Sequence, residues 1–213
     1  MSYTNIPGEE VERRSLATID KEAGDHGFSK LEWPIVKRMI HASADFSIMK
    51  LLTFSGDPVQ SGIDALKAGV PIVTDSSMMK SGISKFRLQK VNPLYEKGNV
   101  FCKIADEDVA AMAKTMHLPR SIFNMRILKD KIDGGIVGIG NAPSALWEVC
   151  RLMKEENVKP ALILAMPVGF VNVIESKAMI EEYDVPYILM QGRRGGTTFA
   201  VSAINALSIL AGN

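Results

Sequence analysis

The sequence has few of the residues that build metal centres and disulfide frameworks. Its 213 residues include two cysteines, Cys102 and Cys150, and three histidines, His26, His41 and His117. The cysteines form no CxxC pattern, so we expect reduced thiols in a cytoplasmic protein rather than a disulfide framework or a zinc motif. The histidines share no metal-like spacing with one another or with the cysteines. The sequence therefore predicts no metal site.

The chain also lacks a large excess of charge and any long apolar run. Lysine and arginine number 25 against 24 acidic residues, a net charge of +1, so no global charge points to nucleic acid or an anionic membrane. The polar start over residues 1–12 does not fit a signal peptide, and no apolar run reaches the roughly 18 residues of a membrane span. With 46% hydrophobic residues, the chain is expected to bury one large core. We expect a single domain over residues 1–213.

Short apolar runs alternate with segments of helical periodicity along most of the chain. Strands are predicted at residues 49–54, 70–74, 100–105, 135–139, 161–166 and 187–190. Helices are predicted at residues 9–23, 30–43, 58–68, 106–117, 143–156, 173–183 and 196–210. Strands that alternate with helices of this length favour right-handed crossovers and parallel pairing. The expected fold is therefore α/β, a three-layer α/β/α arrangement with a mostly parallel, doubly wound sheet and N-terminal helices.

Three loops are expected at the carboxyl ends of strands, where ligands bind in open α/β sheets. They cover residues 140–143, 167–170 and 191–196. The last contains Arg193 and Arg194 among glycines, which suits the capture of a carboxylate or phosphate group but also a solvated surface turn. The segment 138–143 begins like a dinucleotide fingerprint, with proline at the third glycine position and no acidic residue where a ribose would be held. A nucleotide-dependent oxidoreductase is thus a weak alternative.

His41 is the one histidine whose position suggests chemistry, because it ends a helical run where a side chain can face both core and cleft. Position alone leaves a packed, a helix-capping and a proton-donating role open. Basic side chains stand beside hydroxyl groups at residues 13–15 and again at residues 80–85. Several local basic patches in a neutral protein suggest a small polyanionic ligand.

Seven blocks in a specific order identify a family resemblance that covers nearly the whole chain. They lie at residues 12–15, 38–42, 66–72, 138–146, 166–171 with 175–177, 192–196 and 203–207. In this order and spacing the chain resembles the precorrin-8X methylmutase family, which includes the cobalt-precorrin-8 enzymes.

The resemblance implies a methyl shift from C-11 to C-12 of precorrin-8X or cobalt-precorrin-8, giving hydrogenobyrinate or cobyrinate in cobalamin biosynthesis. This is an intramolecular sigmatropic rearrangement, so no external methyl donor and no cofactor are implied, although the substrate itself can carry cobalt. Positioning and protonation of a ring nitrogen are then the tasks left to the protein. In the family a histidine of the block at residues 38–42 donates that proton, and here it is His41.

The resemblance also implies which residues bind the tetrapyrrole and its carboxylate side chains. The expected substrate-binding residues are Arg14, Ser15, Ser84, Lys85, Arg120, Asn141, Gly169, Phe170 and Arg193. Ser84 stands where some members have threonine, so a hydroxyl is retained with a less constrained rotamer. Members of the family are homodimers with sites near the subunit interface, and product hand-off to neighbouring pathway enzymes is possible. A non-catalytic corrinoid-binding or channelling protein is the alternative function.

Overall fold

Six strands form one sheet in the order β1-β6-β5-β4-β2-β3 in the computed structural model, which describes residues 5–212. Residues 1–4 and 213 of the expected domain lie outside the described residues. The strands are β1 (Leu52–Ser55), β2 (Ile72–Thr74), β3 (Val100–Phe101), β4 (Ile136–Ile139), β5 (Leu162–Ala165) and β6 (Tyr187–Met190). Every pairing is parallel except that of β1 with β6. The expected α/β fold with a mostly parallel sheet is confirmed.

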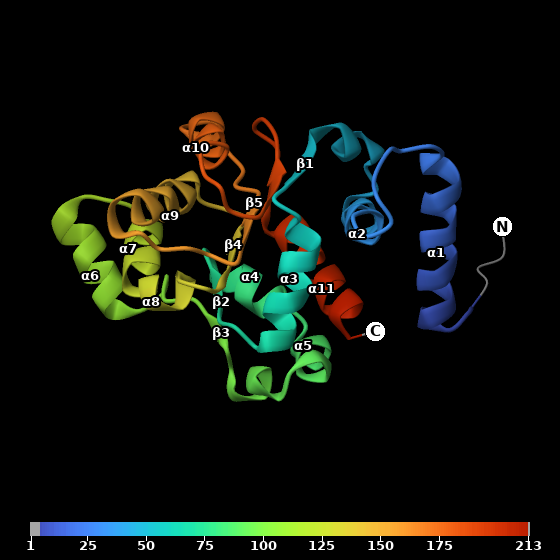
Figure 1. The fold of residues 1–213 in the computed structure, drawn as a ribbon, viewed down its shortest axis with the longest axis horizontal. Coiled ribbons are helices and arrows are strands. Elements are labelled where there is room, and N and C mark those ends of the chain that lie inside the picture. The colour runs from blue at the N-terminus through green and yellow to red at the C-terminus, as the bar shows by residue number, and fades with distance from the viewer. Residues whose placement is uncertain (1–4, 213) are drawn as a thin grey trace.

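Helices cover both faces of this sheet (Figure 1). One face carries α2 (Trp33–Ser43), α3 (Pro58–Ala68), α4 (Ser77–Gly82), α5 (Lys85–Val91) and α11 (Thr197–Ala211), with α1 (Gly8–Ala23) outside α2. The other face carries α6 (Glu107–Met116), α7 (Arg120–Ile127), α8 (Lys129–Ile132), α9 (Pro143–Glu156) and α10 (Val173–Ile180). Among the described residues no helix is long and apolar enough to cross a membrane.

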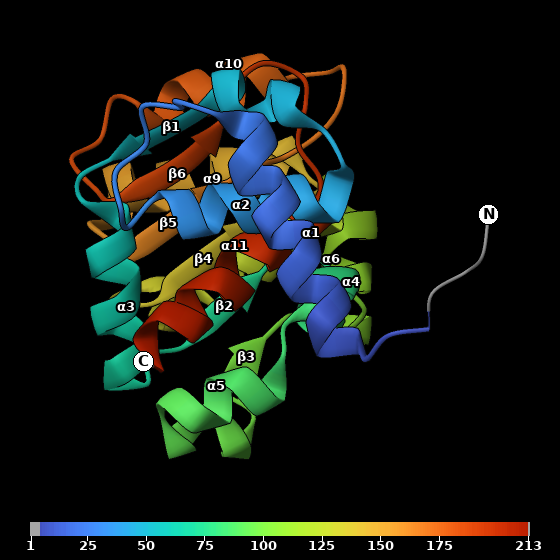
Figure 2. The same cartoon turned by 90° about the vertical axis from the view of Figure 1, so that its right-hand side faces the viewer.

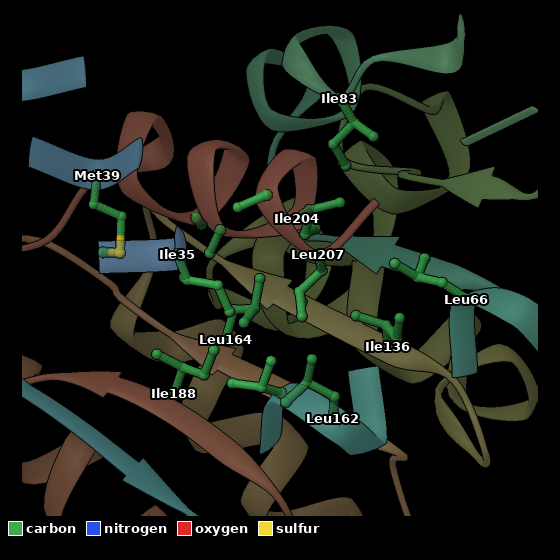
Figure 3. Close-up of a cluster of buried hydrophobic side chains, with 14 of the residues drawn as sticks. Ile35, Met39, Leu66, Ile83, Ile136, Leu162, Leu164, Ile188, Ile204 and Leu207 are labelled. Atoms are coloured by element: carbon green, nitrogen blue, oxygen red, sulfur yellow. The ribbon is translucent and has the colours of Figure 1, made fainter. Parts of the chain in front are cut away.

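The central strands are buried on both sides, as expected for parallel strands between helical layers. Successive residues of β5 alternate between two hydrophobic clusters: Leu162 and Leu164 belong to one, Ile163 and Ala165 to the other. The first cluster fills the space between the sheet and α2, α3 and α11, and Figure 3 shows Leu164 within it. The fully apolar runs seen in the sequence therefore reflect two cores, one on each face.

The structure differs from the sequence prediction at several short elements. The strand predicted from residue 49 begins only at Leu52, because Phe46–Leu51 forms a 3₁₀ helix. Asp45 caps this helix by accepting a hydrogen bond from Ser47 N. The strand predicted over residues 100–105 stops at Phe101. No helix was predicted over residues 75–99 and 118–134, where the chain forms α4, α5, a 3₁₀ helix at Pro93–Lys97, α7 and α8. Short helices of this kind depend on caps and packing more than on periodicity.

The loops that follow β4, β5 and β6 pack against one another at the carboxyl edge of the sheet. A Cβ atom at Gly195 would lie 2.3 Å from the carbonyl oxygen of Pro167, so only glycine allows these two loops to meet. The N–H of Gly196 donates to the carbonyl of Met166 over 2.9 Å, and the N–H of Met166 donates to Ile139. The expected gathering of strand-end loops at one edge is therefore present.

Candidate functional site

A cavity of about 490 Å³ lies between α1 and α2 and brings three of the predicted site residues together. His41, near the end of α2, lines it with Arg14 and Ser15 of α1. The rest of the lining is mostly apolar and comes from Ile6, Val11, Thr18, Ile19, Glu22, Ile40, Ala44 and Phe46. We call this cavity the His41 groove. It places an imidazole beside a guanidinium and a hydroxyl.

Three polar contacts hold α1 in place on α2, and α1 crosses over the outer side of α2 (Figure 2). Arg38 of α2 pairs with Glu12 of α1. Asp20 of α1 accepts from Trp33 Nε1 over 2.7 Å and from Lys37 Nζ over 3.0 Å. These contacts hold the helix that carries Arg14 beside the helix that carries His41.

The Arg14 side chain is oriented within its own helix. Its Nε donates to Glu10 Oε1 over 2.7 Å, and Arg13 Nε donates to the other oxygen of the same carboxylate. Hydrogen bonds from both arginines lower the pKa of Glu10 to about 2. Ser15 Oγ donates to the carbonyl of Val11 over 2.8 Å. The Ser15 oxygen can still accept a hydrogen bond from a ligand.

A second group of predicted residues meets at the ends of β5 and β6. The N–H of Gly169 donates to the carbonyl of Arg193 over 3.4 Å, and the Arg193 guanidinium carbon lies 5.7 Å from the Phe170 ring centroid. Gly169 has a φ of 154° with open space where a Cβ would point, a backbone conformation that other residues rarely adopt. Phe170 is 84% exposed. An aromatic face and a guanidinium are thus presented together to solvent.

The loop after β6 is tied to the segment that follows His41. Arg194 pairs with Asp45, and Arg194 Nη1 donates to Ser47 Oγ over 2.6 Å. Hydrogen bonds from Ser47 and Arg194 lower the pKa of Asp45 to about 2, so its carboxylate stays ionised. The two neighbouring arginines, which look equivalent in the sequence, therefore differ: Arg194 is held by the protein, whereas Arg193 stacks on Phe170.

Four further predicted site residues belong neither to the lining of the His41 groove nor to the group at the ends of β5 and β6. Ser84 caps α5, with its Oγ accepting from Arg87 N over 3.4 Å, and Lys85 is the first, exposed residue of that helix. Arg120 begins α7 on the opposite face of the sheet, next to a second cavity of about 680 Å³ lined by Pro119 and ten further residues of the α7, α9 and α10 region. Asn141 is exposed in the loop between β4 and α9.

Comparison with known proteins decides the family. A family model described as precorrin-8X methylmutase matches residues 10–210. The chain belongs to the precorrin-8X methylmutase family. It is therefore a methylmutase, an intramolecular transferase of the isomerase class that acts in cobalamin biosynthesis.

Relatives of two kinds show the same membership over almost their full lengths. A cobalt-precorrin-8 methylmutase of Priestia megaterium is 42% identical over 206 residues, which are 97% of this chain and 89% of that protein. A precorrin-8X methylmutase of Sinorhizobium sp is 36% identical over 203 residues, 94% of each. The crystal structure of the precorrin-8X methylmutase from Thermus thermophilus has a TM-score of 0.87 and 41% identity, with 96% and 97% of the two chains covered.

The glycines that resemble a dinucleotide fingerprint serve internal packing in this methylmutase. A Cβ atom at Gly140 would lie 2.6 Å from Thr197 Cα, and one at Gly138 would lie 2.1 Å from Met79 Cε. Atoms of α11 and α4 therefore occupy the space beside Gly140 and Gly138, and that space is not open for a pyrophosphate. Internal packing accounts for these glycines, so they do not support the nucleotide-binding alternative.

Sequence reasoning missed Asp75, whose carboxylate binds two backbone N–H groups just before α9. Asp75 Oδ2 accepts from the N–H groups of Asn141 and Ala142 over 2.7 and 2.8 Å. Its side chain is 1% exposed, and Oδ1 has no hydrogen-bond partner among the described residues. Burial raises the pKa of this carboxyl although the backbone N–H groups act in the opposite direction. The sequence signal was an acidic residue directly after the buried strand β2.

Lys177 of α10 is a buried lysine that contacts the loop after β6. Its Nζ donates to the carbonyls of Gly192 and Arg194 over 2.8 and 2.7 Å, and burial lowers its pKa to about 8. In the sequence, Lys177 lies in one of the family blocks, and no role was predicted for it. Within residues 5–212, no three histidine, cysteine, aspartate or glutamate side chains gather as metal ligands.

Proposed function

We propose that this methylmutase moves a methyl group from C-11 to C-12 of precorrin-8X or of cobalt-precorrin-8, giving hydrogenobyrinate or cobyrinate. Family membership supports the reaction, and relatives named for each substrate match the chain over most of its length. The single structural observation that carries the proposal is the His41 groove, where an imidazole, a guanidinium and a hydroxyl line one mostly apolar cavity. Such a lining suits an apolar ring system with carboxylate side chains.

In the proposed mechanism His41 donates a proton to a ring nitrogen of the substrate. Protonation withdraws electron density from the ring and lowers the barrier to migration of the methyl group, which leaves C-11 and bonds to C-12 within one molecule. An imidazole can supply a proton near neutral pH. The exposed position of His41 in the groove leaves it accessible to a substrate. The proton returns to the imidazole when the product leaves.

The charged side chains are proposed to bind the acetate and propionate groups. Arg14 and Ser15 act inside the groove, and Arg193 and Phe170 act at the neighbouring strand-end loops, since guanidinium groups bind carboxylates in a bidentate manner. Lys85 and Arg120 lie on other parts of the surface. We propose that the enzyme is a homodimer in which the partner subunit brings such residues to the site. Light scattering of the purified protein measures the dimer directly.

The function is tested by mixing purified protein with precorrin-8X and, separately, with cobalt-precorrin-8. The proposal predicts conversion to the hydrogenobyrinate or cobyrinate absorption spectrum without added cofactor. The comparison of initial rates for the two substrates decides which metal state is used. Tight product binding without conversion of either substrate would instead support the non-catalytic corrinoid-binding or channelling protein. A cytoplasmic location and hand-off of the product to a following enzyme stay predictions.

A further inference from the structure

Lys177 is the most deeply buried cation of the sites described above, and its surroundings supply no carboxylate. Its side chain is 1% exposed, and no ion pair to it forms among residues 5–212. Both of its hydrogen bonds end on backbone carbonyls of one loop, those of Gly192 and Arg194. Burying an ammonium group without a counter-charge opposes folding, and here burial lowers the pKa of Lys177. An apolar side chain at this position would avoid that cost.

The two carbonyls that Lys177 binds belong to the residues on either side of Arg193. Fixing both neighbours restricts the backbone of Arg193 itself, and the carbonyl of Arg193 receives the N–H of Gly169. The Arg193 side chain remains exposed, with its guanidinium over the Phe170 ring. Lys177 therefore holds the one loop arginine that is not paired with a carboxylate within the described residues.

We propose that Lys177 is a positioning residue: by binding the carbonyls of Gly192 and Arg194 it holds Arg193 in the orientation that receives a substrate carboxylate. This inference rests on the proposed function, because it assigns Arg193 to the tetrapyrrole. Lys177 does not touch the substrate and acts through the loop alone. Its contribution consists of preorganisation, since a loop already ordered loses less entropy on binding.

The test is a double-mutant cycle of Lys177→Met and Arg193→Ala, read as the dissociation constant for hydrogenobyrinate. Methionine keeps the length of the side chain and removes the donors. In the otherwise unchanged protein, Lys177→Met is expected to weaken binding about tenfold or more, as Arg193→Ala does, and to raise KM with little change in kcat. In the Arg193→Ala background, Lys177→Met is expected to change binding by less than about twofold. Lys154→Met, on the exposed end of α9, is the matched control and should bind normally.

A merely structural role would show as additive effects of the two substitutions, and this result would overturn the proposal. Circular dichroism checks that each variant is folded. If Lys177→Met does not fold, the cycle is run with Lys177→Gln, which keeps N–H donors on a shorter side chain; non-additivity supports the proposal and additivity overturns it. Wild-type protein that converts neither precorrin-8X nor cobalt-precorrin-8 and binds neither hydrogenobyrinate nor cobyrinate would overturn the proposed function as well. If the wild-type protein converts one substrate and binds its product, an additive cycle measured with that product overturns the role of Lys177 alone.

Discussion

Asp75 gives the sharpest stability prediction, because its one paired oxygen holds the β4–α9 loop. The perturbation is Asp75→Ala, which removes the acceptor for the N–H groups of Asn141 and Ala142. A buried donor left without a partner costs about 1–3 kcal/mol, so two cost about 2–6 kcal/mol. For a domain of this size about 2–4 °C of Tm is lost per kcal/mol, so Tm should fall by about 4–24 °C.

Asp75→Asn is the matched control, because its side-chain carbonyl can accept the same two N–H groups without a charge. Burial raises the pKa of Asp75, so the folded protein binds more protons than the unfolded chain just above pH 3.8, and stability falls as pH rises through that window. The neutral asparagine does not incur this loss, but its NH2 group takes the place of Oδ1, which has no partner among the described residues, so Asp75→Asn should lose less stability at pH 7 than Asp75→Ala. Urea unfolding followed by tryptophan fluorescence measures both variants. Equal losses for alanine and asparagine, or no loss for alanine, would refute the reasoning.

Three further predictions use other parts of the structure. Arg14→Ala should weaken hydrogenobyrinate binding about tenfold in a titration. Arg13→Ala is the control and should leave binding unchanged, because the Arg13 side chain does not line the His41 groove. Equal losses in the two variants would contradict the groove as the binding site. Leu164→Ala should lower the free energy of unfolding by about 2–5 kcal/mol, because Leu164 is fully buried between the sheet and the helices, and a loss below about 1 kcal/mol would contradict that packing. The pKa of Lys177, lowered from 10.5 to about 8 by burial, predicts that wild-type stability rises relative to Lys177→Met between about pH 8 and pH 10.5; a pH-independent difference in urea unfolding would contradict it.

The central strands, which lie between the two hydrophobic clusters, were predictable because their sequences fit few other secondary structures. A run such as residues 161–166 is apolar at every position, which is typical of a strand covered on both faces, and the structure buries it completely from Leu162 to Ala165. Residues 75–99 were not predictable in the same way. They form short helices capped by Ser76 and Ser84, and such caps are weak signals without a longer periodic segment.

Some residues of the candidate site were predictable from the sequence and others were not, and the difference has a physical reason. His41, Arg14 and Ser15 were proposed from the family resemblance, and the structure places them on one groove. The contacts of Asp75 could not be foreseen, because its partner amides lie 66 and 67 residues further along the chain. Lys177 looked like an ordinary residue in the first turns of a helix, and its burial depends on how α10 packs against the loop after β6.

Turnover by His41→Ala tests the central claim most directly. Purified wild-type protein and the variant are titrated with hydrogenobyrinate and then mixed with precorrin-8X and cobalt-precorrin-8 while the absorption spectrum is recorded. The proton-donor role predicts unchanged product binding and a loss of turnover of about 10²- to 10⁴-fold in the variant. Full activity of His41→Ala with the substrate that the wild-type protein converts would contradict the mechanism.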